Sequence, residues 1–328
     1  MIIAVLRSLV VLSLLASLGG CGETVLSPIG PVGAAERTIL LDALAIMLAI
    51  VVPTIVATLG FAWWYRAGNK RARYLPDFEY SGQLELLVWS VPALVVLFLG
   101  GIAWISSHEL DPAQPLTWAA AAPALAPADT SHTLAPSRAA HPATPAGQPS
   151  APLEIEVVSL DWKWLFIYPG EQVASINRLV VPTGVPLHLR VTSATVMNVF
   201  FVPRLGSEIY SMSGMATQIN LRADQPGTYP GLSANFSGDG FSDMHFSLEA
   251  VSTDQFNAWV ASSKATGEVL DDTAYRALLR QTSNIKPYTY RAVDSGLFNR
   301  IVSLKLPSGD GPPATPSASV ASPSTGDH

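Results

Sequence analysis

The sequence contains little charge and only one cysteine. Of its 328 residues, 13% are charged and 49% are hydrophobic, whereas soluble domains carry about 25% charged residues. Membrane-spanning segments are therefore expected. The single cysteine, Cys21, excludes an intrachain disulfide and a cluster of thiolate metal ligands. The net charge of −6, without a basic tail, argues against nucleic acid as a partner.

Residues 1–20 have the pattern of a secretory signal peptide. A basic residue, Arg7, precedes an apolar run from Leu9 to Leu18, and small residues follow. The stretch Leu18-Gly19-Gly20-Cys21 matches the lipobox of bacterial lipoproteins. We expect cleavage after residue 20 and a lipid on the sulfur of Cys21, at the start of a segment spanning 21–40. The alternative is an uncleaved signal anchor with an incidental cysteine.

Two apolar runs can each cross a bilayer. Ala43–Tyr65 and Leu86–Ser107 hold no charged residue, and each reaches the roughly 20 residues that a spanning helix requires. The loop between them is rich in Arg and Lys, so the positive-inside rule places it in the cytoplasm. The sequence thus predicts a transmembrane hairpin over 41–107, with both outer ends and the remaining chain in the periplasm.

The composition changes after the hairpin. Residues 108–151 are rich in Pro and Ala without apolar periodicity, which is typical of an extended linker. Residues 152–252 alternate short β-rich runs with Pro-Gly turn signals, which predicts a β-sandwich. The clearest predicted strands are Ile155–Leu160, Leu187–Thr192, Val196–Val202 and His245–Val251.

The C-terminal part carries two helical patterns within residues 253–305. They cover Asp254–Ala265 and Asp271–Gln281. Thr253, and Asp271 or Asp272, are the possible N-caps, because hydroxyl and carboxylate side chains accept hydrogen bonds from the first free N–H groups of a helix. Residues 306–328 are rich in Pro, Ser, Gly and Ala, which predicts a disordered tail.

Several stretches, in a fixed order after the lipobox and the two spans, carry a family pattern. They are Glu85–Pro92 (ELLVWSVP), Asp161–Pro169 (DWKWLFIYP), Val196–Gly206, Tyr210–Met215 and Pro226–Gly238 (PGTYPGLSANFSG). Together they resemble subunit II of the haem–copper terminal oxidases, and the last stretch resembles the ubiquinol oxidases of the cytochrome bo type. The resemblance covers most of the chain outside the linker and the tail. It implies a membrane-anchored all-β protein, in which a two-helix hairpin is followed by a periplasmic cupredoxin-like β-sandwich and short C-terminal helices.

In the cytochrome c oxidases of this family, the region corresponding to the last stretch holds a dinuclear copper centre. By the resemblance, its two cysteine positions fall on Ser233 and Ser237, and its two histidine positions on Asn198 and Phe241. Only Met244 keeps a ligand side chain. Copper prefers thiolate and imidazole ligands. The resemblance therefore implies no metal in this subunit, with haem b, haem o and copper in the partner subunit I.

Two further interpretations concern neighbouring residues. A mononuclear copper site of Met244, His245 and Met215 is a weak alternative, since cupredoxin sites use one Cys and two His. Trp162 and Trp164 lie two residues apart and share one face of a strand. They are either fillers of the sandwich core or the remains of a surface where electrons enter from a docked cytochrome.

The resemblance also implies the function. The chain is expected to be subunit II of a proton-pumping ubiquinol oxidase in the bacterial inner membrane, with subunits I, III and IV and membrane lipid as partners. Ubiquinol would bind through subunit I, and this chain alone would not be catalytic. Glu85 would lie at the cytoplasmic mouth of a proton pathway, although a carboxylate in the first turn of a helix can also be a simple interfacial residue. The alternative function is a non-enzymatic membrane lipoprotein with a cupredoxin-like binding or assembly module.

Overall fold

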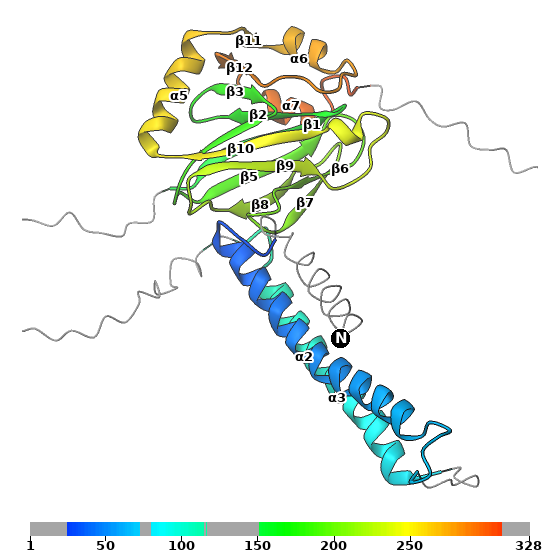
Figure 1. Cartoon of the computed structure of the whole chain (residues 1–328). Helices are drawn as coiled ribbons and strands as arrows, with labels where there is room; N and C mark the ends of the chain where they lie inside the picture. Colours follow the sequence, from blue (N-terminus) through cyan, green and yellow to red (C-terminus); the bar gives the residue numbers. More distant parts are fainter. Residues whose placement is uncertain (1–24, 73–79, 115, 117–150, 310–328) are drawn as a thin grey trace, which may run out of the picture. The chain divides into compact units, whose positions relative to one another are not determined.

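The computed structural model describes residues 25–72, 80–114, 116 and 151–309, which divide into two compact units (Figure 1). Of the described residues, the first unit contains 25–28 and 32–111, and the second contains Ile29–Pro31 together with the chain from Pro112 onward. The predicted signal peptide, Cys21, most of the Pro/Ala-rich linker and the tail after 309 lie outside the described residues.

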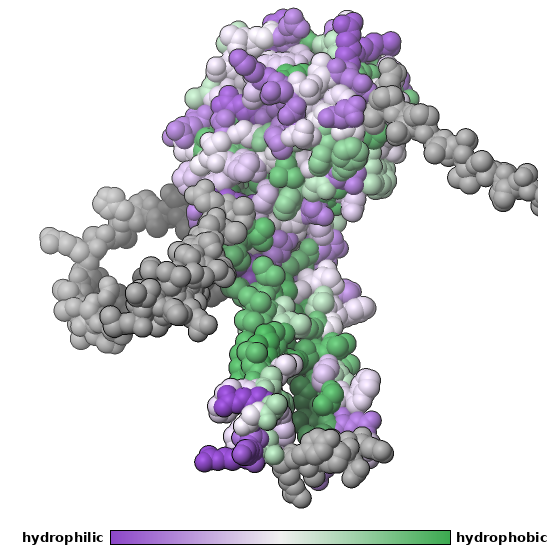
Figure 2. All heavy atoms as spheres, turned by 45° about the vertical axis from the view of Figure 1, so that its right-hand side comes forward, coloured by the Kyte–Doolittle hydropathy of each residue, from purple (hydrophilic) through white to green (hydrophobic). Residues whose placement is uncertain are grey.

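The first unit consists of two long helices, α2 (Pro31–Trp64) and α3 (Gly82–Glu109). Both are long and apolar enough to cross a membrane, and their apolar side chains are exposed along their length (Figure 2). The 34 residues of α2 correspond to about 51 Å of helix, more than the roughly 30 Å of a bilayer's hydrocarbon core. Helix α2 begins at Pro31, so residues 31–42 extend the predicted span, which starts at Ala43, at its N-terminal end.

The second unit is a sandwich of two sheets. The six-stranded sheet has the order β12-β3-β2-β1-β5-β8, and the five-stranded sheet has the order β4-β10-β9-β6-β7. Pairs β1–β5 and β4–β10 are parallel, and the other pairs in these sheets are antiparallel. The strands are β1 (Leu153–Leu160), β2 (Lys163–Tyr168), β3 (Val173–Ile176), β4 (Arg178–Pro182), β5 (Leu187–Ser193), β6 (Asn198–Phe201), β7 (Glu208–Ser211), β8 (Thr217–Leu221), β9 (Gly227–Ser233), β10 (His245–Val251) and β12 (Tyr288–Tyr290).

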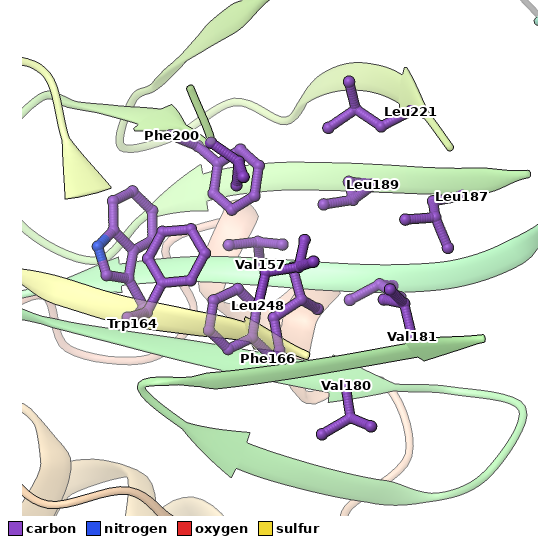
Figure 3. Packing of buried hydrophobic residues seen from close by; sticks show 14 of the residues in the cluster. Val157, Trp164, Phe166, Val180, Val181, Leu187, Leu189, Phe200, Leu221 and Leu248 are labelled. Atoms are coloured by element: carbon purple, nitrogen blue, oxygen red, sulfur yellow. The ribbon is translucent and has the colours of Figure 1, made fainter. Parts of the chain in front are cut away.

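The core between the sheets contains a cluster of aromatic rings around Trp164, and the end of the sandwich that holds it is called the aromatic end. Figure 3 shows Trp164, Phe166 and Phe200 on one side of the cluster and leucines of β5 and β8 on the other. The rings of Phe200 and Phe246 stack with centroids 5.2 Å apart, and Trp164 meets Phe200 edge-on at 5.7 Å. Such pairs stabilise the sandwich beyond the burial of their apolar area alone.

A second core covers the outer face of the six-stranded sheet. Val158 and Leu160 of β1 and Leu165 and Ile167 of β2 pack there against residues of the C-terminal helices. Strand β2 and the second half of β1 are therefore buried on both faces. The first half of β1 keeps polar alternation, since Glu154 is exposed and Glu156 is half-buried. The helices α6 (Asp272–Leu278) and α7 (Leu297–Val302) and the small ladder of β11 (Val269–Leu270) with β13 (Ala292–Val293) belong to this layer.

Two details of the predicted helices are corrected. Helix α5 (Thr253–Ala265) has Ser252, not Thr253, as its N-cap, because Gln255 completes a capping box with Ser252. Asp271 caps α6 as expected, accepting a hydrogen bond from the N–H of Ala274 at 2.8 Å. Helix α6 ends at Leu278, short of the predicted Gln281, and the carbonyl group of Arg280 accepts a hydrogen bond from Lys163.

Candidate functional site

Four of the five positions assigned to the copper site come together at the aromatic end of the sandwich. Asn198 begins β6, Ser233 ends β9, Ser237 lies in the following loop, and Met244 directly precedes β10. Their exposed fractions are only 1%, 4%, 6% and 1%. The hydroxyl of Ser237 lies 3.9 Å from the sulfur of Met244, and the N–H of Ser233 donates to the carbonyl of Met244 at 3.3 Å.

A buried hydrogen-bond network connects two of these positions with the rest of the sandwich. The hydroxyl of Ser233 donates to Oδ1 of Asn198 at 3.1 Å, and Nδ2 of Asn198 donates to the hydroxyl of Ser159 at 3.4 Å. Ser159 and Ser211 share a hydrogen bond of 2.7 Å, and Ser211 also donates to the carbonyl of Thr192. The polar atoms at the histidine position and the first cysteine position thus have partners within the protein, as buried polar atoms require.

Ser159 and Ser211 are members of this network that the sequence analysis missed. Both are fully buried. A signal was available for Ser159, which follows Ile155 and Val157 at the two-residue spacing of one strand face. A serine that continues an inward-facing apolar row needs a buried partner, and the pattern indicates that need without identifying the partner.

Phe241, the second histidine position, has a different environment. It starts the 3-10 helix η2 (Phe241–Asp243) and is half-buried. Its ring lies edge-on to that of Phe236 with centroids 5.6 Å apart, and Phe236 is 73% exposed. The aromatic pair therefore lies at the surface, and Phe241 adds no donor atom to the buried group.

These side chains do not fit a dinuclear copper centre. They offer two hydroxyls, one amide and one thioether, whereas copper in such sites requires thiolate and imidazole ligands. Among the described residues, no group of three or more His, Cys, Asp or Glu side chains is placed to hold a metal ion. The mononuclear alternative does not fit either, since Met244 is buried while the next residue, His245, is exposed. The side chain of Met215 is 44% exposed.

The two tryptophans next to this region are core residues, as the first of the two interpretations proposed. Trp164 is completely buried and Trp162 nearly so, and both belong to the cluster between the sheets. The indole N–H of Trp162 donates to the carbonyl of Ser237 at 3.1 Å. A Cβ atom at Gly240 would lie 2.2 Å from the Trp162 ring, so only glycine allows this loop to pack on the tryptophan.

Lys163, between the two tryptophans, points to the other face of the sheet and is also buried. Its Nζ donates to the carbonyls of Arg280 at 2.8 Å and Asp161 at 3.3 Å and to the hydroxyl of Thr282 at 2.7 Å. Burial lowers the pKa of Lys163 to about 8, and the charge of Asp161 opposes this shift. The three acceptors match the three N–H bonds of an ammonium group, so this lysine fastens the segment after α6 to the sheet.

Glu85 lies in the first turn of α3 with an exposed side chain. Its backbone N–H donates to the carbonyl of Ser81 at 2.9 Å. A carboxylate at this position interacts favourably with the positive end of the helix dipole, and a carboxylate at the end of a spanning helix is also suited to proton relay. The structure therefore permits both interpretations of Glu85, whereas Cys21 lies outside the described residues.

Comparisons with known proteins agree with the resemblance. Residues 158–251 match the family model of the cytochrome c oxidase subunit II periplasmic domain. The chain is 44% identical to ubiquinol oxidase subunit 2 of Acetobacter aceti, over 87% of this chain and 84% of that protein. It is 40% identical to cytochrome bo(3) ubiquinol oxidase subunit 2 of Pseudomonas aeruginosa, over 89% of this chain and 80% of that protein.

Among solved structures, the periplasmic domain of subunit II of the cytochrome oxidase of Bradyrhizobium japonicum is 24% identical. The structural match covers 36% of this chain and 96% of that domain, with a TM-score of 0.34. The assignment therefore rests on the sequence relatives and the domain match, which favour the oxidase subunit over a non-enzymatic lipoprotein. The chain belongs to the subunit II family of the ubiquinol oxidases and is a membrane subunit of a haem–copper oxidoreductase complex.

Proposed function

We propose that this chain is the copper-free subunit II of a proton-pumping ubiquinol oxidase that reduces oxygen to water. The observation that carries the proposal is the hydrogen bond between Ser233 and Asn198, because it joins two former ligand positions through side chains that cannot bind copper tightly. Haem b, haem o and copper would lie in the partner subunit I. Subunits III and IV would complete the complex in the bacterial inner membrane.

The missing copper ligands also favour ubiquinol over cytochrome c as the electron donor. A cytochrome c docked on the sandwich would find no metal in this domain to accept its electron. Ubiquinol, in contrast, dissolves in the membrane and can reach subunit I without passing through the sandwich. In this proposal the chain contributes to assembly, covers subunit I on the periplasmic side and supplies one proton-uptake group, Glu85.

The electron donor and the copper content test the proposal together. The purified complex should oxidise ubiquinol with oxygen and should show no sustained turnover with reduced cytochrome c. The chain separated from its partner subunits should hold no stoichiometric copper after copper loading, by elemental analysis and electron paramagnetic resonance. Sustained oxidation of cytochrome c, or one tightly bound copper per chain, would contradict it.

We also propose that the mature protein is a lipoprotein with lipid on Cys21. The lipobox is the support for this proposal. Two spanning helices hold the chain in the membrane far more strongly than one lipid does, so the lipid is expected to position the N-terminal segment rather than to anchor the protein.

A further inference from the structure

The edge strand β8 binds the chain segment that follows α3. The backbone N–H of Asn220 donates to the carbonyl of Pro112 at 2.9 Å. The side-chain amide of Asn220 donates to the same carbonyl at 3.2 Å and to the carbonyl of Gln114 at 3.1 Å. An edge strand otherwise leaves its outward N–H groups unpaired, so these bonds hold the segment on β8.

The chain just beyond β8 binds the segment that precedes α2. The N–H of Asp224 donates to the carbonyl of Ile29 at 2.7 Å, and the N–H of Ile29 donates to the carbonyl of Arg204 at 2.9 Å. Ile29 is 1% exposed and belongs to the core between the sheets. A Cβ atom at Gly30 would lie 2.0 Å from the carbonyl oxygen of Arg222, so any other residue there would force the two backbones apart.

Asn220 is held in position by its neighbours in the six-stranded sheet. Its Oδ1 lies 2.8 Å from Nδ1 of His188. Because the amide nitrogen of Asn220 faces carbonyl groups, Oδ1 must accept this bond and Nδ1 of His188 carries the hydrogen. Asn220, His188 and Glu154 lie side by side on β8, β5 and β1, and Nε2 of His188 is 3.9 Å from Glu154.

The order of these strands also indicates how long the Pro/Ala-rich linker needs to be. The linker leaves the described chain near Gln114, which Asn220 holds, and returns at β1, where the N–H of Leu153 donates to the carbonyl of Pro186. Neighbouring strands are about 4.8 Å apart, and the segment on β8 is separated from β1 by three such spacings, so the gap is roughly 14 Å. A few residues could bridge such a gap, and the length of the linker is not needed to make the connection.

We propose that residues 220–224 form a clasp that holds, on the edge of the sandwich, the two chain segments next to the transmembrane helices. The clasp binds Ile29 and Gly30, directly before the first residue of α2, and Pro112 and Gln114, shortly after the last residue of α3. Holding these two segments on the sandwich would then not require residues 117–150.

Hydrogen exchange in the assembled oxidase, followed by mass spectrometry, tests the clasp. The variants are Gly30→Ala, which opens the Arg222 contact, and Asn220→Asp, which keeps the shape but removes both side-chain donors. Exchange in peptides covering 218–226 should become about tenfold faster or more in each variant. Peptides covering β2 should keep their protection, which shows that the sandwich remains folded.

Matched controls separate the clasp from general effects of substitution. Gly170→Ala places its Cβ in open space, and Asn257→Ala removes an exposed amide on α5, so neither should change exchange in 218–226. Replacing 117–150 with a short Gly/Ser connector should leave protection of 218–226 and ubiquinol turnover unchanged. The proposal is overturned if both clasp variants keep full protection, or if the shortened linker loses it.

Discussion

The hydroxyl of Ser233 donates a hydrogen bond to Oδ1 of Asn198, linking β9 to β6 in the buried end of the sandwich. By the family resemblance, these are two of the positions that bind copper in cytochrome c oxidases. The loss of a metal normally leaves a cavity or unpaired polar atoms, both of which reduce stability. Here Ser233 and Asn198 bond to each other and to the serines behind them, so their buried polar atoms are paired without a metal.

Removing one partner of this pair should destabilise the sandwich more than removing an exposed serine. Ser233→Ala leaves Oδ1 of Asn198 buried without that donor, and we expect the free energy of unfolding to fall by about 1–3 kcal/mol. Ser242→Ala, at an exposed position of η2, should change it by less than about 0.5 kcal/mol. Urea unfolding followed by tryptophan fluorescence measures both.

A double-mutant cycle then tests whether the two residues act as a pair. The cost of Asn198→Leu combined with Ser233→Ala should be smaller than the sum of the single costs by about 1 kcal/mol, because the second substitution no longer leaves a partner unpaired. Strictly additive costs would show that the bond contributes nothing to stability.

The strands were more predictable than the surroundings of their side chains. Runs rich in β-formers identified β1, β5 and β10 to within a few residues, since turn residues bound them. The burial of Lys163 was not predictable, because the cover over it comes from residues more than 100 positions later in the chain. The Ser159–Asn198 contact was equally hidden, because the packing of one sheet on the other, which a local pattern does not encode, brings β1 and β6 together.

Lys163 should give the stability of the sandwich a particular pH dependence. Its pKa is about 8 in the folded protein and about 10.4 in an unfolded chain. Between these values the unfolded state binds more protons, so the free energy of unfolding should rise as the pH increases from 8 towards 10. Urea midpoints at pH 7.5 and 9.5 should show the rise in the wild type, and Lys163→Met should reduce it.

The difference between wild type and Lys163→Met separates the contribution of the lysine to this pH dependence from that of the buried tyrosines. Burial raises the pKa of Tyr168 and Tyr290 above their ordinary values, so their contribution is lost only at more alkaline pH, as the unfolded state ionises first. They are present in both proteins and cancel in the difference. An identical pH dependence in wild type and Lys163→Met would refute the assignment.

Lipidation of Cys21 can be tested by intact mass. The purified subunit should lack residues 1–20 and carry the added mass of a diacylglycerol and an acyl chain. Cys21→Ala should remain in the membrane fraction, because two spanning helices retain it, and it should keep its signal segment. A wild-type protein that still begins at Met1 and carries no lipid would exclude the lipoprotein hypothesis.

Glu85 is the residue of this chain that we expect to take part in proton transfer. Glu85→Gln removes the titrating group with little change in volume, so the complex should assemble with normal haem content but turn over several-fold more slowly. Glu85→Asp should restore part of the rate, because it returns a carboxylate one methylene shorter. Glu109→Gln is the matched control, since it removes an exposed carboxylate from the opposite end of the same helix. Ubiquinol oxidase activity per haem, measured for all four proteins, distinguishes the two roles of Glu85. A Glu85→Gln complex with the turnover of the wild type would make this residue a simple interfacial carboxylate.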